Sequence, residues 1–386
     1  MTRHPLPATA DCVIVGGGVV GCSLAYHLAA GGMRPLLLER AELGAGSTVR
    51  CAGGVRQQFS TAANVRVSML SRRLLERFEE EIGTTPAYRP IGYLFLASTE
   101  EQAAQLRRNV ALQQATGLDD VELVDVDRIA ELVPDVRVDD LRLGSLCPSD
   151  GLAGPSEVTH GYAGAARRHG AVIVEGCAVE EVVRDGGRVT GVRAAAGRLV
   201  ATPLVIDCAG PHAATVGRMA GIEVPVLPFR RHVFVTEHFE TSRPLPMTVD
   251  MATTFYSHPE GEGLLLGMSD PDEPSSFDTN VAWAFLERLI EVAVHRIPIL
   301  DRAAIRTGWA GLYEVSPDHQ AIVGPSEVEG FWLCCGFSGH GFMQAPAMGR
   351  LLATQILGGV PEIDLAPFDP GRFVSGAIPD PELSVI

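Results

Sequence analysis

The sequence predicts an α/β protein in which a helix-covered parallel sheet alternates along the chain with an α+β part built on a large antiparallel sheet. Three observations support this fold class. Near the start, a buried strand, a glycine-rich turn, a helix and a second buried strand follow one another. Residues 231–268 contain three strand-like segments separated by turns. Residues 331–357 then return to a strand, a glycine-rich turn and a helix.

The first of these units is typical of a strand–helix–strand crossover. Residues 12–15 are a short apolar run of the kind found in buried parallel strands. A helix is expected to follow as far as Ala30, where two glycines end it, and residues 35–39 are expected to form the second strand. Such a unit joins parallel strands, which cannot be connected by a tight turn.

The turn inside this unit has the pattern G-x-G-x-x-G, formed by Gly16, Gly17, Gly18, Val19, Val20 and Gly21. In this pattern the first glycine permits the tight turn, the second lets the backbone approach a pyrophosphate, and the third lets the helix pack closely on the strand. The start of the helix offers free N–H groups and a positive dipole end to phosphate. Glu39 ends the second strand, where an acid can bind ribose hydroxyls. The turn therefore predicts a Rossmann-like dinucleotide site, without separating NAD from FAD.

The remaining segments complete the expected architecture. We expect helices at 63–82, 100–115, 156–169 (capped by Ser156), 280–296 and 343–357, and strands at 90–97, 171–183, 188–194, 198–202, 204–210, 231–237, 247–257 and 263–268, with turns at 185–187 and 259–261. Because the two kinds of section alternate, we expect interleaved domains. The dinucleotide-binding domain would comprise residues 1–86, 150–222 and 306–386, and the substrate-binding domain residues 87–149 and 223–305.

Composition excludes several classes of function. The net charge of −16 argues against nucleic-acid binding, which requires a basic face. The eight cysteines lack the spacing of a metal site, so we expect no metal. No apolar run is long enough to span a bilayer, and the first ten residues lack the apolar region of a signal peptide. We therefore expect a cytoplasmic protein with reduced thiols.

Further motifs separate FAD from NAD. They are Gly46-Ser47 with Arg56 downstream, DCAG at 207–210, GLYEVSPDH at 311–319 and GFSGHGF at 336–342. With the first turn and Glu39, this order resembles the D-amino-acid oxidase superfamily of FAD-dependent oxidoreductases over nearly the whole chain. Within it, the sequence is most similar to sarcosine oxidases and to the β-subunits of sarcosine oxidase and proline dehydrogenase. The resemblance implies an FAD-binding domain of the glutathione-reductase type.

The same resemblance implies how FAD would be held. Ser47 would contact a phosphate, Val179 would meet the adenine through its backbone, and residues 339–343 would lie along the flavin ring. The expected FAD-binding residues are Gly16, Gly17, Gly18, Val19, Val20, Gly21, Glu39, Arg40, Gly46, Ser47, Ala52, Gly53, Gly54, Val179, Ala209, Gly210, Gly339, His340, Gly341, Phe342 and Met343. For His340, an ordinary turn histidine remains the alternative. Gly311 stands where monomeric sarcosine oxidases carry the cysteine that links to flavin, so we expect non-covalent FAD.

The resemblance also locates the substrate. Arg56 falls at the position that binds the substrate carboxylate, and a guanidinium can grip a carboxylate with two parallel hydrogen bonds. A surface arginine, or one that pairs with phosphate, is the alternative. Met343 replaces a second carboxylate-binding lysine, Leu265 the lysine that helps to reduce O₂, and Ser269 a pocket histidine. These changes predict a substrate that is bulkier or less polar than sarcosine, and slow reaction of the reduced flavin with O₂.

Two residues on a strand of the expected substrate sheet complete the expected site. Tyr256 either lines the substrate pocket or belongs to the core, and the two alternatives stay open. His258, beside the 259–261 turn, is expected to be an exposed turn histidine. Arg56, Tyr256 and Met343 are the residues on which the substrate end is expected to depend.

The expected reaction is oxidation of a carbon–nitrogen bond in an amino acid or a secondary or N-methylated amine, sarcosine-like or proline-like. Hydride would pass to flavin N5, and the resulting imine would hydrolyse. O₂ or another acceptor would take the electrons. Two alternatives stay open: a non-catalytic FAD protein or assembly factor that keeps the fold, and a β-subunit that acts only with a partner chain. A homo-oligomer is equally compatible with the sequence, whereas an NAD-dependent dehydrogenase is disfavoured because GFSGHGF would then have no role.

Overall fold

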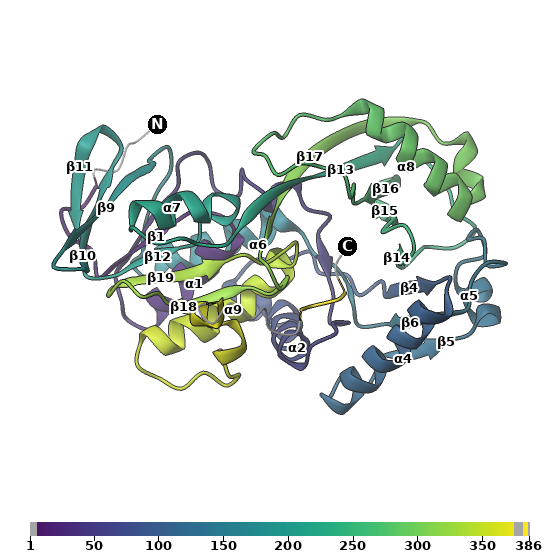
Figure 1. Ribbon diagram of the computed structural model, residues 1–386, viewed down its shortest axis with the longest axis horizontal. Helices are drawn as coiled ribbons and strands as arrows, with labels where there is room; N and C mark the ends of the chain where they lie inside the picture. Colours follow the sequence, from purple (N-terminus) through teal and green to yellow (C-terminus); the bar gives the residue numbers. More distant parts are fainter. Residues whose placement is uncertain (1–5, 374–380, 385–386) are drawn as a thin grey trace.

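The computed structural model describes residues 6–373 and 381–384. Figure 1 shows two lobes, one built on a largely parallel sheet and the other on a larger sheet. The long strands β13 (Leu227–Thr236) and β17 (Ile305–Val315) reach across between the lobes. The mixed α/β architecture and the interleaving of its two parts confirm the predicted fold class.

The first sheet has six strands. Across the sheet they are β18 (Ile322–Pro325), β19 (Phe331–Cys335), β12 (Val205–Asp207), β1 (Cys12–Val15), β2 (Pro35–Leu38) and β8 (Val172–Val174). Neighbouring strands are parallel except for β18 and β19. The buried apolar strands, joined through helices, account for this parallel arrangement.

Both faces of this sheet are covered. On β1, Cys12 and Ile14 pack with helices α1 (Val19–Ala30), α2 (Ala62–Glu76), α6 (Pro155–Arg168) and α9 (Gly341–Ile356). Val13 and Val15 face the other side, as the two-residue period of a strand requires. There they pack with helix α7 (Ala213–Met219) and an antiparallel sheet of β9 (Val179–Asp185), β10 (Arg188–Ala194) and β11 (Arg198–Ala201).

The second large sheet has eight strands. Besides β13 and β17, it contains β4 (Tyr93–Ala97), β5 (Glu122–Val124), β6 (Leu143–Cys147), β14 (Met247–Asp250), β15 (Tyr256–Glu260) and β16 (Gly263–Met268). Its pairs are antiparallel except for β14 with β4. One face packs on α8 (Trp283–Arg296) and α5 (Val126–Leu132), and α4 (Glu100–Ala115) packs against β4, β5 and β6. The short elements α3 (Phe78–Ile82), β3 (Gly54–Val55) and β7 (Gly151–Leu152) lie in the connections.

Several predicted boundaries were wrong. The helix expected at 63–82 is divided at Arg77 into α2 and α3. The strand expected at 171–183 is β8 and β9 in different sheets, because the chain turns at Gly176, whose φ is +66°. Ser156 is not the helix cap, since α6 begins at Pro155 after Gly154. A proline at the first helical position needs no N–H partner, which explains the earlier start.

The predicted division into domains stays a prediction, because sheet membership is a different property from domain membership. The strand β17 begins at Ile305 and belongs to the eight-stranded sheet, so it crosses the predicted boundary at 306. Within residues 6–373 and 381–384, no helix combines the length and apolar character needed to cross a bilayer.

Candidate functional site

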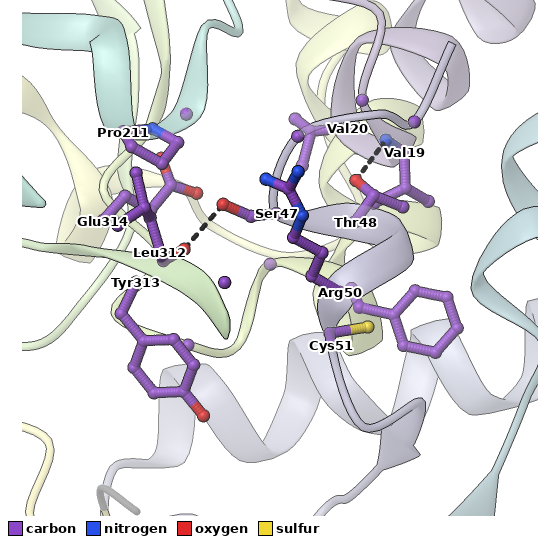
Figure 2. A pocket seen from close by; sticks show the side chains of 18 of the residues that line it. Val19, Val20, Ser47, Thr48, Arg50, Cys51, Pro211, Leu312, Tyr313 and Glu314 are labelled. Carbon is purple, nitrogen blue, oxygen red and sulfur yellow. Dashed lines mark hydrogen bonds between the residues drawn. The ribbon is translucent and has the colours of Figure 1, made fainter. Parts of the chain in front are cut away.

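A cavity of about 650 Å³ runs from the carboxyl ends of β1 and β2 to the face of the eight-stranded sheet. This is where α/β sheets generally bind their ligands. Figure 2 shows part of it. Of the residues predicted to bind FAD, the cavity is lined by Gly16, Gly18, Val19, Val20, Glu39, Arg40, Gly46, Ser47, Ala52, Gly53, Gly54, Ala209, Gly210, Gly339, His340, Gly341, Phe342 and Met343. Gly17, Gly21 and Val179 are not among the lining residues.

The glycine turn brings the backbone close to this cavity. Gly16 has a φ of +110°, and a Cβ there would lie 2.4 Å from the carbonyl oxygen of Cys208. A Cβ on Gly21 would lie 2.0 Å from the carbonyl oxygen of Gly16, so this glycine sets the packing of α1 rather than touching a ligand. The helix α1 begins after Gly18 without a side-chain cap from that residue. Its positive end therefore faces the cavity, as an anionic group requires.

The acid at the end of β2 is held firmly. The Glu39 carboxylate accepts hydrogen bonds from the N–H groups of Gly17 and Ala41, each at 2.7 Å. Beside it, the Arg40 guanidinium lies 2.8 Å from His212 Nε2. Burial, followed by the nearby Arg40, lowers the pKa of His212 to about 4, so its ring is neutral and accepts this hydrogen bond. Two polar side chains are thus fixed at the end predicted to bind the adenosine ribose.

The loop after β2 contributes residues that sequence reasoning partly missed. Ser47, predicted to contact phosphate, donates its hydroxyl to the Leu312 carbonyl at 2.6 Å. Its neighbour Thr48 accepts a hydrogen bond from Val19 N–H at 3.2 Å, so it reaches the start of α1 (Figure 2). Arg50 also lines the cavity, and Figure 2 shows its side chain extending toward the start of α1. No motif found in the sequence analysis pointed to Thr48 or Arg50.

Arg50 contributes a cation to the wall of the cavity. Among the described residues, its guanidinium makes no hydrogen bond and no ion pair, whereas its backbone carbonyl accepts from Trp309 Nε1 at 2.9 Å. Gly311 is packed against it, since a Cβ there would lie 3.0 Å from Arg50 Cβ. An unpaired guanidinium beside a helix N-terminus makes this part of the cavity strongly attractive to an anion.

Arg56 lies at the other end of the cavity, directly after β3. Its side chain is 1% exposed, and its guanidinium packs over the ring of Phe59 at 4.3 Å and that of Phe95 at 5.4 Å. It donates to the carbonyl oxygens of Gln58 at 2.7 Å and Ser384 at 2.8 Å. No carboxylate among the described residues lies within 4.0 Å of it. A surface position for Arg56 is therefore wrong, whereas its substrate role and the phosphate-pairing alternative stay predictions.

A buried acid positions the chain beside Arg56. Asp150 accepts hydrogen bonds from Gln57 N–H at 2.8 Å and from Gln58 Nε2 at 3.1 Å. Burial raises the pKa of Asp150 to about 6, against the opposing effect of these hydrogen bonds. The main chain that carries Arg56 is thus tied to the β6–β7 connection.

His340 lies close to Arg56, and whether it contacts the flavin or is a turn histidine stays a prediction. It immediately precedes α9, is buried, and its Nε2 lies 3.2 Å from Arg56 Nη2. Burial, and then the charge of Arg56, holds the pKa of His340 well below its usual value, so the ring is neutral. Because arginine only donates, His340 Nε2 accepts, and the histidine helps to orient the guanidinium.

The other residues predicted for the substrate end differ in whether they line the cavity. Tyr256 and Met343 both line the cavity, and Gly267 makes room for the tyrosine, since a Cβ there would lie 2.1 Å from the ring. His258, expected to be exposed, is fully buried on β15, because Pro259 and Glu260 continue the strand. Leu265 is buried in an apolar cluster with Tyr256.

These residues fit FAD. Its pyrophosphate would meet the start of α1 with Thr48 and Arg50, its ribose the Glu39 end, and its ring the Gly53–Gly54 and Gly339–Met343 backbone. In the part of the chain that the structure describes, no group of three His, Cys, Asp or Glu side chains could hold a metal ion.

Comparison with known proteins agrees with this geometry. The profile of a family described as FAD dependent oxidoreductase matches residues 11–355. This chain therefore belongs to the DAO family of FAD-dependent oxidoreductases, and FAD is its cofactor.

Individual relatives are similar along most of the chain. Human mitochondrial sarcosine dehydrogenase is 34% identical over 96% of this chain but only 42% of its own length, so the chain spans under half of that relative. Sarcosine oxidase subunit beta of an Arthrobacter species is 27% identical, covering 96% of this chain and 92% of its own. Among solved structures, L-proline dehydrogenase from P. horikoshii superposes with a TM-score of 0.91 at 31% identity, covering 97% of this chain and all of its own.

Proposed function

We propose that this chain catalyses the FAD-dependent oxidation of a carbon–nitrogen bond in a substrate that carries a carboxylate. An amino acid, or a secondary or N-methylated amine of the sarcosine or proline type, fits this description. The names of the sarcosine and proline dehydrogenases that the chain resembles support this class of substrate.

The observation that carries the proposal is the environment of Arg56. A buried guanidinium without an anionic partner is unfavourable by several kcal/mol, and neutral carbonyl groups offset this only in part. A carboxylate bound there would supply the missing charge and could accept two parallel hydrogen bonds. Arg56 lies in the same cavity as the glycine-rich turns predicted to contact the flavin. The substrate would therefore be anchored by its carboxylate with its amine end toward the cofactor.

When bound, FAD would supply a hydride acceptor for the carbon next to the substrate nitrogen. The protein would orient that carbon and exclude water. Arg56 would hold the carboxylate, while the buried Tyr256 and the apolar Met343 would form walls around the rest of the substrate. Because Met343 has no charge, it favours substrates that are less polar than one gripped by two cations.

We further propose that FAD is bound without a covalent link. Gly311 lines the cavity and has no side chain that could form one. Burial raises the pKa of the nearby Cys51 thiol to about 11, so it is a weak nucleophile at neutral pH. Acid precipitation should release all yellow colour into the supernatant, and colour retained on the protein would contradict this.

Arg56→Met tests the substrate assignment. We expect kcat/KM for an N-methyl amino acid to fall by about a hundredfold or more, because a charge-assisted bidentate contact is lost. The same change should leave oxidation of the matching amine without a carboxylate within about threefold. An equal loss with both substrates would show that Arg56 acts on folding or on FAD rather than on the carboxylate.

The assembly and location of the protein also stay open to test. Similarity to a protein named as a β-subunit supports a search for a partner chain, by comparing turnover of the isolated chain with that of material purified under mild conditions. The predicted cytoplasmic location stays a prediction, since several relatives are named as mitochondrial.

A further inference from the structure

The segment Pro381–Ser384, here called the docking segment, lies against the substrate end of the cavity. Glu382 in this segment is fully buried, although it is a charged residue near the end of the described chain. A surface tail would not bury a carboxylate, so the segment occupies a specific binding site.

Glu382 anchors the docking segment to the start of α2. Its carboxylate accepts hydrogen bonds from Ser60 N–H at 2.7 Å and Ser60 Oγ at 2.6 Å, from Thr61 N–H at 3.2 Å and from Asn64 Nδ2 at 3.0 Å. A carboxylate is favourable at a helix N-terminus, where N–H groups lack partners. The backbone N–H of Glu382 also donates to the Asp318 carbonyl at 2.9 Å. The anchor therefore connects α2 with the polar network around Asp318.

Two residues further on, the docking segment reaches Arg56. The Ser384 carbonyl accepts from Arg56 Nη2 at 2.8 Å, and the Ser384 hydroxyl accepts from Asn109 Nδ2 at 3.3 Å. The second N–H of Nη2 is directed at His340 Nε2, at 3.2 Å. A guanidinium can grip a carboxylate through Nη1 with Nη2, or through Nε with Nη2. Both arrangements need Nη2, and in this structure both of its N–H groups are used.

We propose that the docking segment is part of the substrate site, and that a substrate carboxylate binds by displacing the Ser384 carbonyl from Arg56. This inference rests on the carboxylate anchor of the proposed function. The exchange replaces a neutral acceptor on a buried cation with an anion, so it is favourable once the ligand carboxylate has lost its water.

The space beside the docking segment suits such an exchange. Leu383 and Ser384 form part of the wall of a second cavity of about 90 Å³, together with Gln58, Phe95 and Asn109. Leu383 is 60% exposed, so little apolar burial opposes its movement. When Ser384 leaves Arg56, this small cavity opens beside the guanidinium and gives room for a substrate side chain. The docking segment would then determine how large a side chain the site admits.

Propionate provides a simple probe, because it has a carboxylate and no amine to be oxidised. We would titrate it into the FAD-loaded protein and follow the change in flavin absorbance. Glu382→Ala removes the anchor and should lower the Kd of propionate about tenfold, since the competing hydrogen bond to a charged donor is weakened. Glu101→Ala is the matched control: it removes an exposed carboxylate from the first turn of α4 and should leave the Kd unchanged.

The outcomes separate this inference from the proposed function. Propionate binding that is equal in the wild type and Glu382→Ala, and that is abolished by Arg56→Met, overturns the inference alone. Binding that does not depend on Arg56 in either protein overturns both the carboxylate anchor and the inference.

A second measurement does not depend on a variant folding correctly. Leu383 N–H donates to Ser60 Oγ at 2.8 Å and Ser384 N–H donates to Glu382 at 2.9 Å, so both amides are protected while the segment is docked. Saturating propionate should accelerate hydrogen exchange of these two amides in the wild-type protein at least threefold, whereas propionamide should not. Unchanged or slower exchange with propionate would refute displacement.

Discussion

Arg50 shows how a single residue can reveal the requirements of a cofactor. Its guanidinium is directed into the cavity near the start of α1 and has no partner among the described residues. The pyrophosphate is the permanently anionic part of FAD, so we expect Arg50 to pair with it. Arg50→Met should weaken FAD binding about tenfold to a hundredfold, the value of a hydrogen bond to a charged group. Reconstitution of the apoprotein, followed by quenching of flavin fluorescence, measures this.

Two controls make the Arg50 experiment specific. Arg107→Met removes an exposed arginine of α4 in the other lobe, and should leave FAD affinity unchanged. Arg50→Lys keeps the charge and should recover part of the affinity. Equal FAD affinity in the wild type and Arg50→Met would mean that the guanidinium serves the substrate or the acceptor instead.

Asp207 predicts a pH dependence of stability. The side chain is fully buried at the end of β12, its Oδ1 accepts from Ala209 N–H at 2.9 Å, and its Oδ2 has no partner among the described residues. Burial raises the pKa of Asp207 well above its usual value. A raised pKa means that the folded state favours the protonated carboxyl. The stabilisation is therefore complete at pH values below the pKa that the group has in the unfolded chain. That stability is lost as the pH rises toward the folded pKa, by up to about 1.4 kcal/mol per unit.

Asp207→Asn should remove this loss, because the amide oxygen can still accept from Ala209 and nothing titrates. We expect the variant to gain free energy of unfolding relative to the wild type as the pH is raised from 4 to 7. Urea unfolding of the two apoproteins at several pH values measures the difference. A difference that stays constant with pH would show that Asp207 is ionised in the folded protein.

At the scale of single residues, sequence patterns predicted those residues whose positions are determined by their neighbours in the chain. Gly16 and Glu39 follow from the strand–turn–helix unit alone, because neighbours in the chain determine their positions. Thr48, Arg50 and Glu382 could not be predicted in the same way. Thr48 reaches Val19, and Glu382 reaches Ser60, across contacts that only the folded chain creates.

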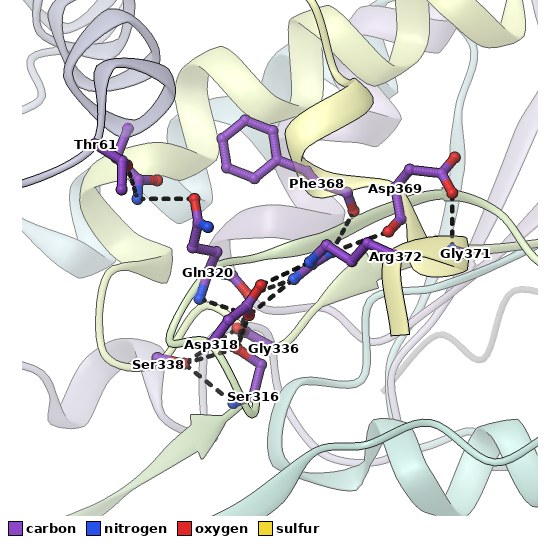
Figure 3. A network of polar contacts seen from close by, with 11 residues as sticks. Thr61, Ser316, Asp318, Gln320, Gly336, Ser338, Phe368, Asp369, Gly371 and Arg372 are labelled. Atoms are coloured by element: carbon purple, nitrogen blue, oxygen red, sulfur yellow. Dashed lines mark hydrogen bonds and ion pairs between the residues drawn. The ribbon is translucent and has the colours of Figure 1, made fainter. Parts of the chain in front are cut away.

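At the scale of elements, the segment after β17 is held by a buried network shown in Figure 3. Arg372 pairs with the fully buried Asp318 at 2.7 Å, and Asp318 also accepts from Gln320 N–H and Ser316 Oγ. Asp318 belongs to the GLYEVSPDH motif. An acid is needed at this position because it ties the strand β17 to residues 370–373. The motif therefore has a structural role beyond the cavity.

Arg372→Met should destabilise the fold by about 3–5 kcal/mol, because it leaves the carboxylate of Asp318 buried without its cation. The control is Arg193→Met, since Arg193 pairs with Glu181 at a similar 2.8 Å but both side chains are largely exposed. That change should cost less than about 1 kcal/mol. Urea unfolding of both variants makes the comparison, and similar losses would show that burial does not determine the strength of these pairs.

Element types were predicted more reliably than element boundaries, for a physical reason. The run from 171 to 183 is β-prone throughout, and nothing in its pattern shows that β8 pairs with β2 while β9 pairs with β10. Pairing is a long-range property of the sheet. Similarly, residues 259 and 260 have turn-like composition, yet they pair with β16 because that neighbouring strand is long enough to continue the ladder.

At the scale of the whole molecule, the cavity combines a dinucleotide-binding edge with the face of a second sheet. The strands β13 and β17 contribute Arg231, Val233 and Tyr313 to its wall, opposite the glycine-rich turns. The resemblance to sarcosine oxidases places Leu265 at the position of a lysine that would assist O₂ reduction. Here the Leu265 side chain is 2% exposed in an apolar cluster.

This difference predicts how the protein passes on its electrons. The first electron transferred to O₂ creates a superoxide anion, which a nearby cation stabilises. Because Leu265 supplies none, we expect the substrate-reduced protein to reoxidise slowly in air-saturated buffer and much faster with an artificial electron acceptor. Leu265→Lys should accelerate the reaction with O₂ at least tenfold, while Leu265→Met, a change of similar size, should not. Stopped-flow absorbance of the flavin measures all three rates. Rapid reoxidation of the wild type would instead mean that the arginines lining the cavity already supply the charge, and that the protein works as an oxidase.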